Sequence, residues 1–124
     1  MGVEREACLH RFWSSFGIPA YDERTVNPDA KMPYITYEAA SGYFDDSLSL
    51  SASLWYHDTD WTDITLKGDE IGRSIGRGGI MRPYKGGSMW VTRGLPFAQR
   101  MSDPNDSSIR RLRLSVDIEF LSGD

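Results

Sequence analysis

The chain has 124 residues, a mass of 14.0 kDa and a mean hydropathy of −0.46, with 40% hydrophobic and 26% charged residues. This length predicts one domain, 1–124, that can bury a core without a disulfide or a metal, and the composition argues against disorder. No apolar run approaches the roughly 20 residues that span a bilayer, which argues against a membrane protein. The first residues do not show a basic segment followed by an apolar one, which argues against a signal peptide.

The charge of the chain is unevenly placed along it. A net charge of −4 and a pI near 5.1 argue against a protein that binds nucleic acid through the electrostatic field of its net charge. Residues 22–63 are mostly acidic, whereas 77–113 hold eight basic residues. Such asymmetry suits head-to-tail association between copies, although it also arises by chance. Cys8 is the only cysteine, which excludes an internal disulfide and fits a reducing compartment.

The first predicted element is a helix over 3–16. Leu9, Phe12, Trp13 and Phe16 recur at the spacing of one apolar face, and a glycine follows. Residues 18–31 contain two prolines and several acids, and we predict a long irregular connection there. A loop of this length more often has a function or becomes ordered on a partner than serves only as a connection.

Two strands are predicted next. Residues 32–39 are rich in β-branched and aromatic side chains, and 48–57 alternate between apolar residues and serines. A turn over 42–46 would join them as a hairpin, with the second strand half-buried.

A second helix is predicted from Trp61 to Ile75, with Thr59 or Asp60 as its N-terminal cap. Gly68 and Gly72 weaken a helix by up to ~1 kcal/mol each, so we expect them to allow close approach to the sheet. The glycines at 76, 78 and 79 end the helix.

The remaining residues predict three strands and a loop. Strands over 80–84 and 88–93 flank a Lys-Gly-Gly turn, and 94–108 read as a second long loop because of two prolines and polar turn residues. Residues 109–121 alternate cleanly: Leu112, Leu114, Val116, Ile118 and Phe120 point one way, and charged residues and a serine point the other.

The predicted fold class is therefore α+β. The element order is α-β-β-α-β-β-β, with a mainly antiparallel sheet and two helices packed on one face. The opposite face carries serines, arginines and acids, which predicts that it is solvated or covered by a partner.

No catalytic, metal or cofactor site is predicted. A nucleophile needs a base, and only His10 and His57 are available. Cys8 and His10 lie two apart on a helix and point in different directions. His57, beside Asp58 and Asp60, could serve a small hydrolase or a metal, but a solvated strand end explains it better.

Two further patterns have structural explanations. Glycines 76, 78 and 79 follow a helix and precede a strand, the reverse of a phosphate-binding loop. The tryptophans and tyrosines could form a base-stacking surface for single-stranded nucleic acid, together with Arg110, Arg111 and Arg113. Their positions match a hydrophobic core better.

Three stretches together resemble a known family: MPYITYEAAS at 32–41, LWYHDTDWTDITLKGDEIGRSIGRGG at 54–79 and MWVTRGLPFAQRMSDPNDSSIRRLRLSVDIEFLS at 89–122. The chain resembles the tail terminator (head–tail joining, tail completion) proteins of long-tailed bacteriophages. The resemblance covers essentially the whole chain after the first helix. It rests on structural patterns, because the family has no chemical signature.

The resemblance implies a virion protein, assembled in the host cytoplasm, that forms a ring, commonly a hexamer. Its implied partners are copies of itself, the tail tube protein and a head-side connector or stopper, with viral DNA passing through the lumen without specific binding; no membrane is implied. Ring formation requires two different, complementary surfaces on each subunit.

We predict these contacts in the acidic and basic segments and the long loops, at Asp22, Glu23, Arg24, Asp45, Asp46, Arg93, Phe97, Arg100, Asp103, Arg110, Arg111 and Arg113. The alternatives are another neck component, such as a stopper or minor tail protein, and a single-strand-binding module.

Overall fold

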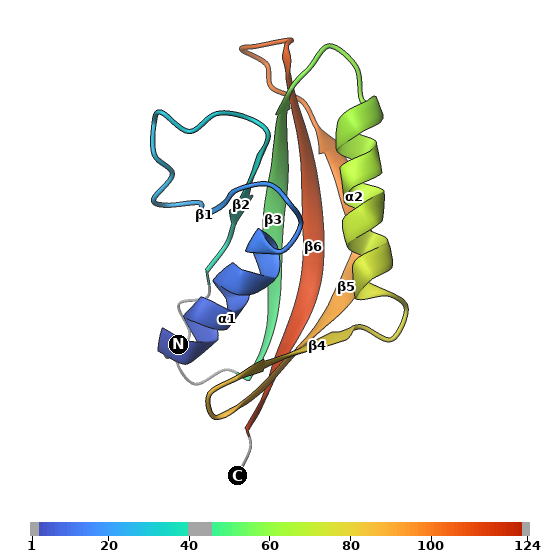
Figure 1. Cartoon of the computed structure of the whole chain (residues 1–124). Coiled ribbons are helices and arrows are strands. Elements are labelled where there is room, and N and C mark those ends of the chain that lie inside the picture. The colour runs from blue at the N-terminus through green and yellow to red at the C-terminus, as the bar shows by residue number, and fades with distance from the viewer. Residues whose placement is uncertain (1–2, 40–45, 123–124) are drawn as a thin grey trace.

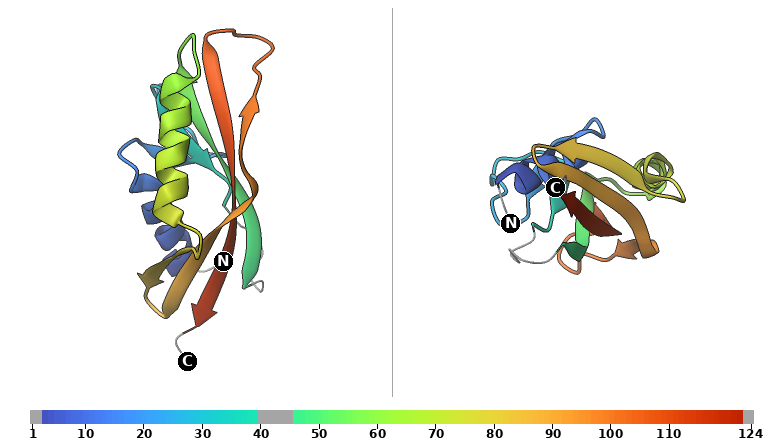
Figure 2. Two further views of the ribbon diagram at one scale, coloured as in Figure 1. Left: turned by 90° about the vertical axis from the view of Figure 1, so that its right-hand side faces the viewer. Right: turned by 90° about the horizontal axis from the view of Figure 1, so that it is seen from below.

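The computed structural model describes residues 3–39 and 46–122, which form one six-stranded sheet with two helices on one face (Figures 1 and 2). The strand order is β1-β2-β3-β6-β5-β4, and every neighbouring pair is antiparallel except β1 and β2. The elements are α1 (Val3–Ser14), β1 (Ala20–Asp22), β2 (Tyr34–Tyr37), β3 (Ser47–His57), α2 (Thr62–Ile75), β4 (Ile80–Tyr84), β5 (Gly87–Met101) and β6 (Ile109–Ser122). The predicted fold class is confirmed.

The alternation of β6 places its apolar residues in the core, as predicted. The five side chains from Leu112 to Phe120 on that face are at most 5% exposed. β6 pairs with β3 along eleven residues of that strand, from Ser47 to His57, and with β5 on its other side. The strand that closes the chain is therefore central in the sheet.

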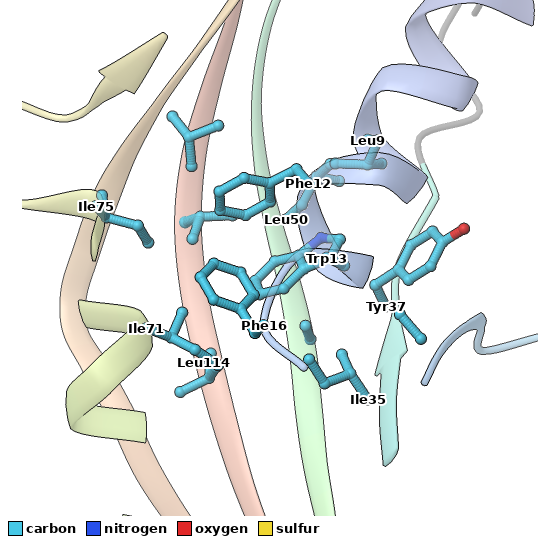
Figure 3. Packing of buried hydrophobic residues seen from close by; sticks show 14 of the residues in the cluster. Leu9, Phe12, Trp13, Phe16, Ile35, Tyr37, Leu50, Ile71, Ile75 and Leu114 are labelled. Atoms are coloured by element: carbon cyan, nitrogen blue, oxygen red, sulfur yellow. The ribbon is translucent and has the colours of Figure 1, made fainter. Parts of the chain in front are cut away.

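The core lies between the sheet and the two helices (Figure 3). α1 contributes Phe12 and Trp13, whose rings meet edge to face with 4.9 Å between centroids, and Phe16 packs at right angles to Phe12. Cys8 is also buried, and burial is the main cause that raises the pKa of its thiol. The spacing that predicted this helix therefore also predicted its buried face.

The predicted connection over 18–31 contains a strand that the sequence did not reveal. β1 pairs in parallel with β2, held by bonds from the Ile35 amide to the Pro19 carbonyl at 2.8 Å and from the Glu23 amide to the Tyr37 carbonyl at 2.9 Å. Three residues are too few to show alternation, so the strand exists only because β2 lies beside it. The prediction of an unbroken loop was wrong.

The prediction of a loop over 94–108 was also wrong for its first half. β5 continues to Met101, and pairing resumes with Ala98 opposite Leu114 after a bulge between Arg93 and Ala98. A Cβ on Gly94 would lie 3.0 Å from the Ser115 carbonyl oxygen, so the bulge needs a residue without a side chain there. The glycine and proline that suggested a loop instead bend a continuous strand.

Helix α2 begins at Thr62, one residue later than predicted. Trp61 occupies the N-cap position and makes no side-chain cap bond, so neither Thr59 nor Asp60 is the N-cap residue. The Asp60 Oδ1 still accepts the Thr62 amide at 2.9 Å. The carboxylate satisfies one of the free amides of the first turn from outside the helix.

The two helical glycines face the sheet, as predicted. A Cβ on Gly68 would lie 2.5 Å from the Leu112 Cδ2, and one on Gly72 would lie 3.1 Å from the Phe97 ring. The Lys85-Gly86 turn between β4 and β5 is confirmed as well, with Gly86 at φ 108°. Of the predicted turn over 42–46, residues 42–45 lie outside the described residues.

Two tryptophans expected in the core lie on the opposite face of the sheet. Trp55 is half-buried and Trp90 is 36% exposed. Trp55 lies on the same side of β3 as the serines, and its indole Nε1 donates to the Thr36 hydroxyl at 2.8 Å. Assigning all the aromatic residues to the core was therefore wrong for these two.

Candidate interaction surfaces

His57, the one residue near which sequence reasoning left room for catalysis, takes part in a small polar cluster. The Ser108 hydroxyl donates to Asp106 Oδ1 at 2.5 Å and lies 3.0 Å from His57 Nε2. Hydrogen bonds from Ser108 hold the pKa of the Asp106 carboxyl below its usual range. Because the serine hydroxyl already donates to Asp106, it is directed at the carboxylate and not at the imidazole.

A nucleophilic triad requires the histidine between the serine and the carboxylate. Here the serine occupies the middle position, so this arrangement does not activate it. The contacts instead fix the 102–108 loop against the end of β3. Across residues 3–39 and 46–122, no group of three or more histidine, cysteine or acidic side chains gathers as a metal site. Neither helix in this part of the chain is long and apolar enough to cross a membrane.

Trp61 contacts two of the predicted interface arginines. The guanidinium carbon of Arg100 is 4.9 Å from the ring centroid, and that of Arg110 is 5.3 Å away. Arg110 also donates to the carbonyl oxygens of Ser107 at 2.6 Å and Thr59 at 2.7 Å. It thus ties the loop before α2 to the loop before β6, which is an intramolecular role.

We expect Arg110→Ala to lower the free energy of unfolding by about 1–2 kcal/mol, because it removes two charge-assisted hydrogen bonds and a cation–π contact. Arg110→Lys should recover less than half of this, since an ammonium group cannot reach both carbonyls from one plane. Urea unfolding at low protein concentration measures the change. Arg113→Ala, an exposed arginine on the same strand, is the matched control, expected to change stability by less than about 0.5 kcal/mol.

The sheet face away from the helices carries the other two predicted arginines of β6. Arg111 stacks over Trp55 with 4.9 Å from its guanidinium carbon to the ring centroid, and its Nε donates to the Ser53 hydroxyl at 3.0 Å. Arg113 is exposed. Further along the strand the Asp117 carboxylate accepts the Ser49 hydroxyl at 2.7 Å. We call this surface the outer face.

The outer face is hollowed because small residues line its middle. One shallow hollow lies over Ser47, Ser49, Trp90, Thr92, Asp117 and Glu119. The next lies over Ser49, Ser51, Ser115, Arg113 and Asp117, bordered by Glu38, Arg93 and Leu95. Leu95 is 97% exposed at the bulge of β5. The face combines charged groups with room for side chains of another molecule.

The remaining predicted contact residues are dispersed. Arg24 pairs with Asp22 at 3.3 Å, and its hydrogen bond is the main cause that lowers the pKa of that carboxyl; Glu23 follows at the end of β1. Asp46 pairs with Arg5 at 3.1 Å, and Asp103 accepts the Asn105 amide. Phe97 packs against the core beside Gly72, Arg93 is exposed at the bulge, and Asp45 lies outside the described residues.

Among the described residues, the structure brings together Arg100 with Arg110, and Arg111 with Arg113, but places Asp22 and Asp46 at different levels of the sheet. Sequence reasoning overlooked the exposed side of α2, including Leu66, which is 59% exposed. The signal was present in the helical period, because a leucine opposite the buried stripe faces solvent.

Comparison with known proteins gives a likeness of fold. No protein-family profile and no curated protein sequence matches the chain. A solved chain described as "Virion of native gene transfer agent (GTA) particle" matches with a TM-score of 0.62 and 12% sequence identity, covering 94% of each chain. At this identity the match shows a shared fold over nearly the whole of both chains.

Proposed function

We propose that the chain is a structural virion protein of a phage-like particle, and within it the tail terminator: a ring, of six copies, that caps the tail tube and joins it to the head-side connector. The observation that carries this proposal is the fold shared with a virion chain over 94% of both molecules. The sequence resemblance to tail terminators points to the same class of particle.

The molecular surface supports assembly. The outer face is polar, hollowed and charged with both signs, as expected of a surface that meets a partner of complementary charge. The candidate for catalysis, His57, lies beside a serine whose hydroxyl already donates to a carboxylate, a geometry that suits a loop anchor. A structural subunit is therefore favoured over a hydrolase.

The single-strand-binding alternative is less well supported. Trp55 is the tryptophan nearest the arginines of the outer face, and Arg111 already covers its ring. A base would have to displace this cation to stack there. Other neck components, such as a stopper or a minor tail protein, remain the alternatives within the proposed class of virion protein.

The test is the mass and shape of the native particle, alone and with tail tube protein. Six times 14.0 kDa predicts a particle of about 84 kDa in native mass spectrometry, seen as a ring by negative-stain microscopy at the end of the tube. A chain that stays monomeric at high concentration and in the presence of tubes would contradict the proposal. A ring that binds elsewhere in the neck would favour a stopper.

A further inference from the structure

The solvent side of α2 carries charged residues in a definite order. Asp63, Asp69 and Glu70 lie in its first three turns, whereas Arg73 lies in the last turn and Arg77 just beyond the helix. Leu66 is in the middle of this exposed side, opposite the buried Ile64, Ile71 and Ile75. We call Asp63, Leu66, Asp69, Glu70, Arg73 and Arg77 the helix stripe; its charge changes from negative to positive along the chain.

The outer face has the opposite order. Along β6 the outward side chains are Arg111, Arg113, Ser115, Asp117 and Glu119, so the charge changes from positive to negative. Glu38 and Arg93 border the middle of this row on its two sides and offset each other in sign. The net effect is a surface that is basic at one end, neutral at the serine and acidic at the other end.

The helix stripe and the outer face lie at matching heights on opposite sides of the molecule. α2 and β6 run in the same direction, from top to bottom in Figure 1 and in the left-hand view of Figure 2. Gly68 packs against Leu112, and Gly72 packs against Phe97, which precedes the pairing of Ala98 with Leu114. These contacts fix which helix residue stands level with which strand residue.

The level of the other residues follows from the geometry of the two elements. A helix rises about 1.5 Å per residue and a strand about 3.3 Å, so roughly two helical residues match one strand residue. From Gly68 at Leu112, the acids Asp69 and Glu70 stand level with Arg113, and Glu70 also pairs with Lys67 at 3.1 Å. Arg73 stands level with Leu114 and Ser115, and Arg77 with Val116 and Asp117. Asp69 and Glu70 are thus level with the positive charge of Arg113, and Arg77 is level with the negative charge of Asp117, on the far side of the molecule.

We infer that the helix stripe of one copy docks on the outer face of the next, with the acids of α2 against Arg111 and Arg113 and with Arg77 against Asp117. This contact rests on the proposed ring. It joins two different surfaces at the same height, so successive copies need no shift along the ring axis, which is the condition for closure.

The contact uses part of the expected interface and replaces another part. Arg111 and Arg113 belong to the predicted basic segment, but their acidic partners lie on α2 rather than over 22–46. Within 3–39 and 46–122, the side chains of Asp69 and Arg113 make no hydrogen bond or ion pair, so changing them tests association with little effect on the fold.

The test is a charge swap between the two surfaces. Arg113→Glu and Asp69→Lys should each raise the concentration at which rings form by about tenfold or more, because like charges then face each other. The double variant should restore assembly to within a few-fold of the wild type. Sedimentation velocity over a concentration series, with and without tail tube protein, measures this, and circular dichroism checks the fold.

The swap of Arg77→Glu with Asp117→Lys repeats the test at the other end, should either variant of the first pair misfold. Glu4→Lys, an equal change of charge on the exposed side of α1, is the matched control and should leave assembly unchanged. If the wild type forms rings and all four single variants form them equally well, this contact is wrong and the proposed ring still stands. Single variants that fail without rescue would show that the two residues meet different partners, and a wild type that forms no ring would contradict the proposed function itself.

Discussion

Trp13→Ala is expected to lower the free energy of unfolding by about 3–5 kcal/mol, a large part of the 5–15 kcal/mol typical of a domain. Trp13 is fully buried and packs against Phe12 and, with 6.4 Å between ring centroids, against Phe16. Removing the indole leaves a cavity beneath α1 that the sheet on the other side cannot fill by collapsing. Urea unfolding followed by circular dichroism measures the loss.

Val3→Ala is the matched control for this prediction. Val3 lies on the same helix but is 77% exposed, so the substitution should change stability by less than about 0.5 kcal/mol. A Trp13→Ala protein that unfolds at the same urea concentration as the control would show that α1 adds little to the core. Since α1 also contacts β1 and β4 near both edges of the sheet, its loss would expose both edges.

The core could be predicted from the sequence because its signals are local and periodic. The buried faces of α1, α2 and β6 follow from the spacing of residues such as Leu9, Ile71 and Leu114. The pairing of β4 with β5 follows from a two-residue turn between them. In these elements, each residue's neighbours along the chain already determine the side on which it is buried.

The elements that escaped prediction depend on distant residues. β1 is formed by hydrogen bonds to β2, and the far half of β5 exists because β6 offers a partner beyond a bulge. Likewise, the level of α2 relative to β6 is set by Gly68 against Leu112, a contact of residues 44 apart in the chain. The candidate docking surfaces depend on this level, so sequence alone could name Arg111 and Arg113 but not their partners.

The glycines after α2 provide a sharp test of the junction between the helix and β4. Gly79 has φ 86°, and a Cβ there would lie 2.5 Å from the Trp90 Nε1 and 2.6 Å from the Val91 carbonyl oxygen. Alanine is strained at this φ and would also push against the backbone of β5, so we expect Gly79→Ala to lower the free energy of unfolding by about 2–3 kcal/mol.

The adjacent Gly78→Ala is the matched control for Gly79→Ala, because Gly78 has no positive φ and a Cβ there meets nothing within 4 Å. It should leave stability within about 0.5 kcal/mol of the wild type, or raise it slightly by restricting the unfolded chain. Thermal and urea unfolding of both variants measure the contrast. The indole Nε1 of Trp90 donates to the Gly78 carbonyl at 3.0 Å. Equal stability of the two variants would mean that β4 can move away from Trp90 without loss of stability. The expected difference would instead show that the close approach of this junction to Trp90 and Val91 requires a glycine at position 79.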